Sequence, residues 1–300
     1  MKRPLILFAI VAAVLAVVIY EGLQAHRKMA VNDSLKQVFS SGTNQGTVLT
    51  NLQTMGARAV PAEVRALSQT GEIGSAAELA LLNNRSATNV LSDVVPLLES
   101  KDSEVRGRAA GIVMDQIANR IRSPDVSILP ALIKALNDTN EYVREDMALA
   151  LSKFGPAAET AVPALAKALE DDSARVRIMA ASALSKIDSS QNAAVIPVFK
   201  DVIANGDARD RHWAAVYLHE IEPTNAEIIP TFISSLTNQD QDIRSSAAYS
   251  LLAYGSAGKI AVPALQKALD DPDAGVKEAA RAALGKIDPE ASNKANVQNQ

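Results

Sequence analysis

The sequence predicts an all-α protein: an α-solenoid, or superhelix, of antiparallel helix pairs that follows an N-terminal transmembrane helix. Three observations indicate this fold class. The chain is rich in alanine and leucine and only 4% aromatic, a composition that favours helices over sheets. Residues 161–188 and 261–288 are identical at seventeen of twenty-eight positions. Prolines preceded by two apolar residues recur every 33 or 34 residues, at Pro130, Pro163, Pro197, Pro230 and Pro263. A period near 33 residues indicates repeated helical units that stack on one another.

The first predicted element is an apolar helix at residues 4–20, a stretch without a charged side chain. Seventeen helical residues span about 25 Å, close to the roughly 30 Å core of a bilayer. Lys2 and Arg3 precede this stretch, which favours a cytoplasmic N-terminus. We therefore predict a membrane anchor and juxtamembrane linker over residues 1–33, in a single-pass membrane protein whose solenoid is extracytoplasmic (periplasmic). Cleavage as a signal peptide, with secretion of the remainder, is the alternative.

The solenoid is predicted over residues 34–288 as about seven helix-pair units, of which the first two are degenerate. The second degenerate unit keeps a capping residue at Asp102 and the Val105–Arg106 pair of the regular units. Terminal units are expected to be atypical, because one of their faces meets solvent. Residues 289–300 lack apolar periodicity, so they are predicted to be a disordered tail.

Each regular unit shows two amphipathic stripes. The first stripe has apolar residues three and four positions apart, as at Val162, Leu165 and Leu169. A proline lies in the first turn of this helix, where a missing N–H costs nothing. The second stripe starts thirteen residues after the proline, at Val143, Val176, Asp210, Ile243 and Val276. These spacings place the apolar residues of each helix on one face and predict a pair of amphipathic helices.

A residue able to cap a helix precedes each second helix. These residues are Asn140, Ser173, Asp207, Asp240 and Asp273. Their side chains accept hydrogen bonds from free N–H groups at a helix start. Capping and periodicity therefore predict the same helix boundaries.

The unit resembles a bacterial HEAT repeat, of the short kind also found in bilin-lyase-like proteins. The resemblance rests on the early proline, an Asp eight residues later and a Val–Arg pair that opens the second helix, and it covers about residues 58–288. In that family the Asp and Arg columns form a ladder of hydrogen bonds between adjacent units. Carried over to this sequence, the structural ladder comprises Arg106, Asp138, Arg144, Asp171, Arg177, Arg211, Arg244, Asp271 and Lys277. Asn205, Asn238 and Lys277 depart from the pattern and predict a weaker ladder toward the C-terminus.

Composition excludes several functions. A net charge of −4 gives no basic field for nucleic acid, and the absence of cysteine excludes disulfides and thiolate chemistry. The Gly–Lys pair within residues 255–260 lacks the spacing of a phosphate loop and repeats the predicted turn at 155–163. The HEAT-like deoxyhypusine hydroxylases bind two irons through several His–Glu pairs, whereas this chain has one, His219–Glu220. We therefore expect no catalytic residue, metal, cofactor or small-molecule substrate.

The second helix at about residues 208–221 and its neighbour carry most of the unusual side chains. His212 and His219 are expected on the solvent side of that helix, because they point away from the stripe that begins at Asp210. Trp and Tyr anchor many protein interfaces, although packing between units is the alternative for these rings. The candidate protein-binding surface comprises His212, Trp213, Tyr217, His219, Tyr249 and Leu252.

The sequence thus predicts a membrane-tethered scaffold or adaptor that binds another protein and has no catalytic activity of its own. The alternative, motivated by the resemblance alone, is a bilin-lyase-like or metal-dependent modifying protein that acts through the solenoid groove.

Overall fold

The structure, a computed structural model, describes residues 64, 67, 68, 78, 81, 82, 90–121 and 125–291. Every regular element within these residues is a helix, as the all-α prediction requires. The chain divides into two compact units, residues 1–164 and residues 165–300, and each is described by itself.

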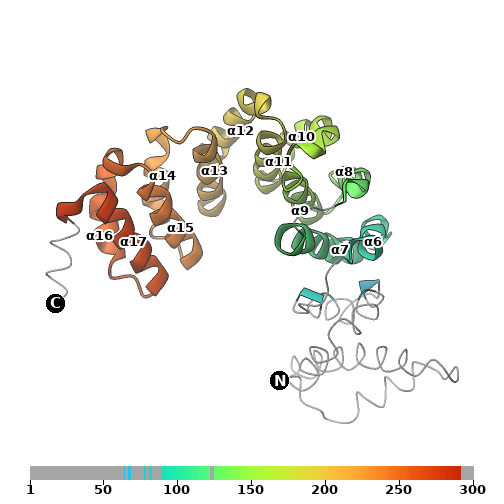
Figure 1. Ribbon diagram of the computed structural model, residues 1–300, viewed down its shortest axis with the longest axis horizontal. Coiled ribbons are helices and arrows are strands. Elements are labelled where there is room, and N and C mark those ends of the chain that lie inside the picture. The colour runs from blue at the N-terminus through green and yellow to red at the C-terminus, as the bar shows by residue number, and fades with distance from the viewer. Residues whose placement is uncertain are drawn as a thin grey trace, which may run out of the picture. The chain divides into compact units, whose positions relative to one another are not determined.

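Unit 1 contains two helix pairs in its described part, and they follow one another in the chain (Figure 1). The first pair comprises α6 (Leu91–Val94), the 3-10 helix η2 (Val95–Glu99), α7 (Ser103–Asp115) and a π turn, η3 (Gln116–Arg120). The second comprises the 3-10 turn η4 (Val126–Ile128), α8 (Leu129–Ala135), α9 (Glu141–Ser152) and the 3-10 helix η5 (Gly155–Ala161). The pairs stack through their second helices, since α7 packs on α9.

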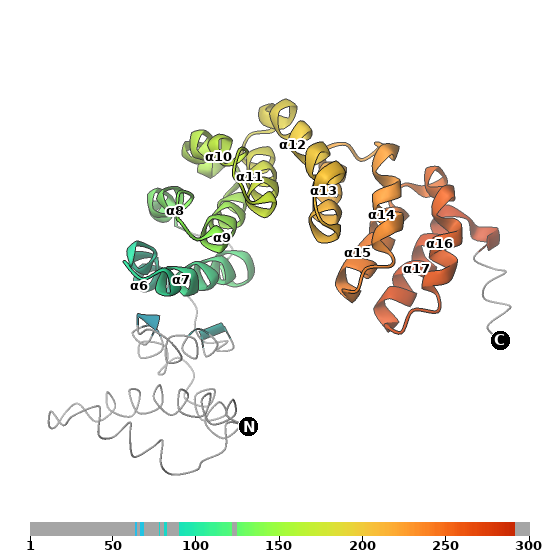
Figure 2. The same cartoon turned by 180° about the vertical axis from the view of Figure 1, so that it is seen from behind.

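Unit 2 continues the same order of helices, and the boundary between the units falls inside α10 (Val162–Ala168). It contains α11 (Ala174–Ile187), η6 (Ser189–Gln191), α12 (Asn192–Asn205), α13 (Ala208–Ile221) and η7 (Ala226–Ile228). It continues with α14 (Ile229–Ser235), α15 (Gln241–Leu252), η8 (Gly255–Ala261), α16 (Val262–Ala268) and α17 (Ala274–Ile287). Second helices again pack in chain order: α11 on α13, α13 on α15 and α15 on α17. Figure 2 shows α15 and α17 side by side.

The apolar stripes predicted from the sequence form the core of each unit. Val143, Val176, Ile243 and Val276 at the starts of the second helices are at most 2% exposed. Phe199 of α12 and Phe232 of α14 are fully buried on the first helices. Because each helix pair exposes an apolar side that its own two helices do not cover, the next pair in the chain provides the cover.

Four of the five predicted capping side chains hold the start of a second helix. Asn140, Asp207, Asp240 and Asp273 each accept a hydrogen bond from a backbone N–H in the first turn. Ser173 makes no such bond, and its own N–H donates to the Asp171 carboxylate 2.9 Å away. At the start of α11 the side-chain hydrogen bond is therefore made by Asp171 in the preceding turn, and not by the side chain of Ser173.

One proline departs from its predicted place in the first turn. Pro130, Pro230 and Pro263 lie at the start of α8, α14 and α16, as expected. Pro197 lies inside α12, because that helix begins at Asn192, five residues before the proline. A helix tolerates proline here only by giving up one backbone hydrogen bond.

The turns predicted at residues 155–163 and 255–260 are formed largely by the 3-10 helices η5 and η8. Gly155 and Gly255 adopt left-handed φ angles of 53° and 51° after the ends of α9 and α15. Only glycine adopts this conformation without strain, which explains why both turns contain it. The Gly–Lys pair at residues 258–259 thus lies in the 3-10 helix η8, between α15 and α16.

The membrane span predicted at residues 4–20 lies outside the described residues. None of the helices that the structure does describe is long and apolar enough to cross a bilayer. The longest of these have 14 residues, whereas a span needs about 20. This finding contradicts the prediction of a single-pass membrane protein with a periplasmic solenoid, which is withdrawn.

The predicted domain ends fall largely outside the described residues as well. The anchor and linker at 1–33 are not among them, nor are residues 292–300 of the predicted tail. Residues 289–291 of that tail are helical, and the Ala291 N–H donates to the Asp288 carboxylate.

Candidate functional site

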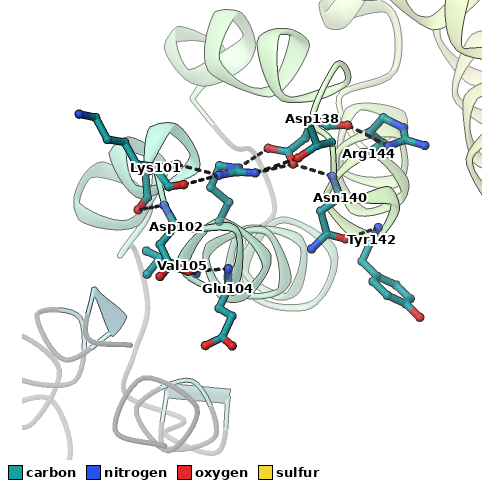
Figure 3. A network of polar contacts seen from close by, with 11 residues as sticks. Lys101, Asp102, Glu104, Val105, Asp138, Asn140, Tyr142 and Arg144 are labelled. Carbon is teal, nitrogen blue, oxygen red and sulfur yellow. Dashed lines mark hydrogen bonds and ion pairs between the residues drawn. The ribbon is translucent and has the colours of Figure 1, made fainter. Parts of the chain in front are cut away.

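Arginines at the start of the second helices join consecutive turns, and the clearest example is in unit 1. Arg106 donates from Nε to Asp138 Oδ2 at 2.5 Å and from Nη2 to Asp138 Oδ1 at 3.1 Å. Its Nη1 donates to the main-chain carbonyl of Ser100, in the turn before its own helix. Figure 3 shows Asp138 at the centre of this network, where it also accepts from the Asn140 N–H. One carboxylate therefore closes its own turn and binds the preceding repeat.

The same contact between an arginine and the aspartate of the next repeat, here called a step of the ladder, recurs in unit 2 between Arg244 and Asp271. Arg244 Nε lies 2.7 Å from Asp271 Oδ2 and Nη2 lies 2.9 Å from Oδ1, and the two side chains are only 12% and 9% exposed. Hydrogen bonds from Arg244 lower the pKa of Asp271 below its usual range, and the nearby Lys277 ammonium acts in the same direction. A bidentate, charge-assisted pair of this kind is among the stronger polar contacts in proteins.

Each ladder arginine also donates to main-chain oxygens of the turn before it. Arg144 and Arg177 bond the carbonyls of Asp138 and Asp171, which lie six residues earlier. The sequence analysis predicts a polar partner six residues before each arginine. At Asp138 and Asp171 the atom that accepts is the backbone oxygen rather than a side-chain atom. Lone carbonyls at the end of a first helix are satisfied in this way.

Two steps of unit 2 lack the aspartate, because Asn205 and Asn238 occupy its position. Arg177 Nη2 lies 3.9 Å from Oδ2 of Asp201, which is one helical turn before Asn205 on α12. Arg211 donates from Nη1 to the Gly206 carbonyl at 2.8 Å and forms no ion pair with the described residues. The weaker C-terminal ladder predicted from the sequence is thus located at these two steps, while the last step, at Asp271, is formed.

His212 is fully buried, contrary to the prediction that it faces solvent. Its Nε2 lies 3.1 Å from the Ser246 hydroxyl of α15, and its ring packs edge-on against Phe232 of α14. Burial lowers the pKa of His212 to about 4. The prediction failed because α13 packs against the pairs on both sides and therefore buries more than one stripe. Ile178, which occupies the equivalent position on α11 and is 1% exposed, was the sequence signal for this burial.

His219 lies nearly two turns further along α13, and it too contacts the next repeat. Its Nδ1 lies 3.0 Å from the hydroxyl of Tyr254, whose ring centroid is 4.9 Å from the imidazole. Burial lowers the pKa of His219 and raises that of Tyr254 to about 12. The prediction that His219 faces solvent is therefore wrong as well, since the side chain is only partly exposed.

Tyr217, on the other side of α13, contacts the first helix of its own pair and the second helix of the preceding pair. Tyr217 stacks on Phe199 with centroids 6.2 Å apart, and its hydroxyl lies 3.8 Å from the Met179 sulfur. The Lys186 ammonium lies 5.2 Å above the Tyr217 ring. Trp213 is half-buried, with its ring 5.2 Å from that of His212. For Tyr217 these contacts favour packing between repeats, the alternative that the sequence left open for the aromatic rings.

The six residues of the predicted binding surface consequently do not form one exposed patch. Tyr249 is the most exposed, at 51%, and Leu252 is half-buried on the same helix. His212, Tyr217 and His219 are used in contacts between helix pairs.

Sequence reasoning missed a groove on the side of the first helices. A cavity of about 670 Å³ lies between α14 and α16. Its apolar lining includes Ile233, Leu236, Pro263 and Ala264, and Ile260 at its edge is 70% exposed. A smaller cavity of about 290 Å³ occupies the corresponding place in unit 1, between η2 and α8. Residues from different repeats line each groove, so no single stretch of sequence displays it.

Metal ligands do not gather in the described part of the chain. Its residues include no group of three or more His, Asp or Glu side chains placed to hold a metal ion.

Comparison with known proteins gives a match to the family model described as HEAT repeats, at residues 129–219 and 196–285. No curated protein sequence matches the chain.

Solved structures with a similar arrangement include a crystal structure of an engineered protein. It is 23% identical, with a TM-score of 0.46, and the match covers 99% of this chain and 86% of that one. Another is the complex of CpcE and CpcF of phycocyanin lyase from Nostoc sp. PCC7120, at 18% identity and a TM-score of 0.46. That match covers 74% of this chain and 92% of the other. At TM-scores this low, neither likeness bears on what this chain binds.

Proposed function

This chain belongs to the HEAT repeat family, and we propose from that premise that it serves as a scaffold that binds another protein. The proposal assigns binding rather than catalysis to the chain. Stacked repeats suit this role, because they present extended surfaces along which a partner can lie.

The observation that carries the proposal is the groove between α14 and α16. Its volume of about 670 Å³ and its apolar lining provide room for a side chain or short segment of a partner. Ile260, 70% exposed at its edge, adds a large apolar side chain whose burial would contribute about 2 kcal/mol to binding. Exposed apolar groups beside a concave surface are typical of protein-interaction sites.

The second-helix face is the competing location, since the sequence analysis placed the binding surface there. Tyr249 of α15 is the member of that set with most of its ring in solvent, at 51% exposed. A test of the function therefore has to compare the groove with this face.

The experiment uses the full chain as bait and compares wild type with Ile260→Asp and Tyr249→Asp. Both positions are exposed, so neither charge is expected to disturb the fold. We expect Ile260→Asp to abolish capture of a partner that wild type retains, and Tyr249→Asp to leave it unchanged. If only Tyr249→Asp abolished capture of the partner, the binding site would lie on the second helices. If capture survived both changes, the groove would not be the binding site.

A further inference from the structure

Two steps of the ladder, one in each unit, show what an arginine at this position can hold. In both, the fork of the arginine side chain meets a carboxylate through Nε and Nη2, as Arg106 does with Asp138 and Arg244 with Asp271. The aspartate also accepts the N–H two residues later through Oδ1, so that Oδ2 faces the arginine Nε. The arrangement is that of a bidentate carboxylate site.

At Arg211 this carboxylate is missing. Nη1 is held by the Gly206 carbonyl, as in the other steps, and this fixes the position of the guanidinium. Within the described residues, neither Nε nor Nη2 has an acceptor. The residue at the aspartate position is Asn238, whose Oδ1 accepts the Asp240 N–H at 2.9 Å.

That hydrogen bond sets the orientation of the Asn238 amide. A backbone N–H requires an acceptor, so the oxygen of Asn238 faces Asp240 and the NH₂ group takes the place that Oδ2 has in Asp138 and Asp271. By equivalence with these two pairs, we expect the nitrogen donors of Arg211 and Asn238 to lie next to each other, where the other pairs have a donor and an acceptor. Water or an anion can accept from both donors, and a carboxylate accepts from a guanidinium more strongly than water does.

Acidic residues near this step are engaged elsewhere. Asp207 accepts from the N–H groups of Arg209 and Asp210 as the cap of α13. Asp240 caps α15 through the Asp242 N–H. The carboxylate of Asp210 lies 3.6 Å from Arg175. The chain thus supplies no carboxylate to Arg211 from these three residues.

We propose that Arg211 and Asn238 form a binding site for a carboxylate, supplied by an aspartate or glutamate side chain of the bound partner protein. The external carboxylate completes the ladder at the step where the chain itself has asparagine. Only the source of the carboxylate rests on the proposed scaffold function; the site itself rests on the geometry of the repeats.

The site is tested without a partner, with acetate as the probe. The Nε–H signals of arginine are followed by ¹H–¹⁵N NMR in the full chain at about pH 7, while sodium acetate replaces sodium chloride at constant ionic strength. Arg211→Gln identifies the Arg211 signal by its loss, and Arg244 serves as an internal control because Asp271 already fills its site. Asn238→Asp provides the matched variant, since it places a carboxylate in the site.

We expect acetate to shift the Arg211 signal saturably in wild type and to leave the Arg244 signal in place. In Asn238→Asp the Arg211 signal should not respond, and the melting temperature should rise. Absence of a shift in wild type would overturn the site. An equal shift in Asn238→Asp would overturn this site as the origin of the response.

The source is tested separately, so that failure of one part does not conceal the other. A partner that wild type captures and Ile260→Asp does not should bind Arg211→Gln about tenfold more weakly than wild type, because a charge-assisted contact is lost. Equal binding by a partner that still depends on Ile260 would overturn the partner as the source of the carboxylate, while leaving the scaffold function and the acetate result intact.

Discussion

His212 places an imidazole in a fully buried position against α14 and α15. Its Nε2 meets the Ser246 hydroxyl, whereas Nδ1 has no hydrogen-bond partner among the described residues. We infer that Nε2 carries the proton, because the other tautomer would bury an unpaired N–H rather than a lone pair. Periodicity could not predict this burial. It assigns one stripe to a helix, and α13 is covered on two sides.

The buried histidine makes stability depend on pH. Its folded pKa of about 4 is below the unfolded value of about 6.5, so the unfolded chain binds a proton first as the pH falls. Stability is therefore highest above about pH 6.5 and decreases progressively toward pH 4, by about 2 kcal/mol at pH 5. Urea unfolding at pH 7.5 and pH 5 measures this loss.

The matched variant is His212→Ile, which copies Ile178 of α11. The other acidic side chains, including Asp240 whose charge acts on His212, are present in both proteins and cancel in the comparison. We expect the variant to lose about 2 kcal/mol less than wild type between the two pH values. The same loss in both proteins would contradict the burial of a neutral imidazole.

Asp146 on α9 gives a second pH effect, of opposite sign. Burial, together with the charges of Glu145 and Glu78, raises the pKa of Asp146 to about 7. Because the unfolded chain ionises first, stability decreases as the pH rises from about 4 to 7. Asp146→Asn should therefore raise the melting temperature at pH 8 and change it little at pH 4. A larger gain at pH 4 than at pH 8 would contradict this account.

The ladder between helix pairs was predictable as columns of residues but not as atoms. Sequence spacing identified Arg106, Asp138, Arg244 and Asp271, and capping residues located most starts of second helices. The spacing could not show that the carbonyl six residues earlier is the acceptor, since every residue has one. It also could not show that Asp201 replaces the missing partner of Arg177, because the two lie on different helices.

The formed step in unit 2 contributes measurably to stability. Asp271→Asn removes the carboxylate from Arg244 in a site that is about one-tenth exposed. We expect it to lower the free energy of unfolding by about 2 kcal/mol, in the range for charge-assisted hydrogen bonds. The adjacent and exposed Asp270→Asn is the control and should change it by less than about 0.5 kcal/mol. Equal effects of both changes in urea unfolding would contradict the ladder.

At the scale of the whole molecule, the repeat pattern predicted the all-helical architecture and the HEAT family correctly. The prediction of a single-pass membrane protein is contradicted, because no helix among the described residues is long and apolar enough to cross a bilayer. The sequence analysis placed the candidate binding surface on the second helices, where conspicuous side chains lie, and that placement stays a prediction. The groove between α14 and α16 is instead lined by common residues, such as Ala264 and Pro263, that two separate repeats bring together.

The central claim is that each helix pair is completed by its neighbours in the chain. Hydrogen exchange of the full chain, compared between wild type and Asp271→Asn, tests it most directly, since exchange reports local opening helix by helix. We expect the amides of α15 and α17 to exchange faster in the variant and those of α7 and α9 to keep their wild-type rates. Equal acceleration in all four helices would contradict the claim, because it would show one globally cooperative core rather than a row of coupled repeats.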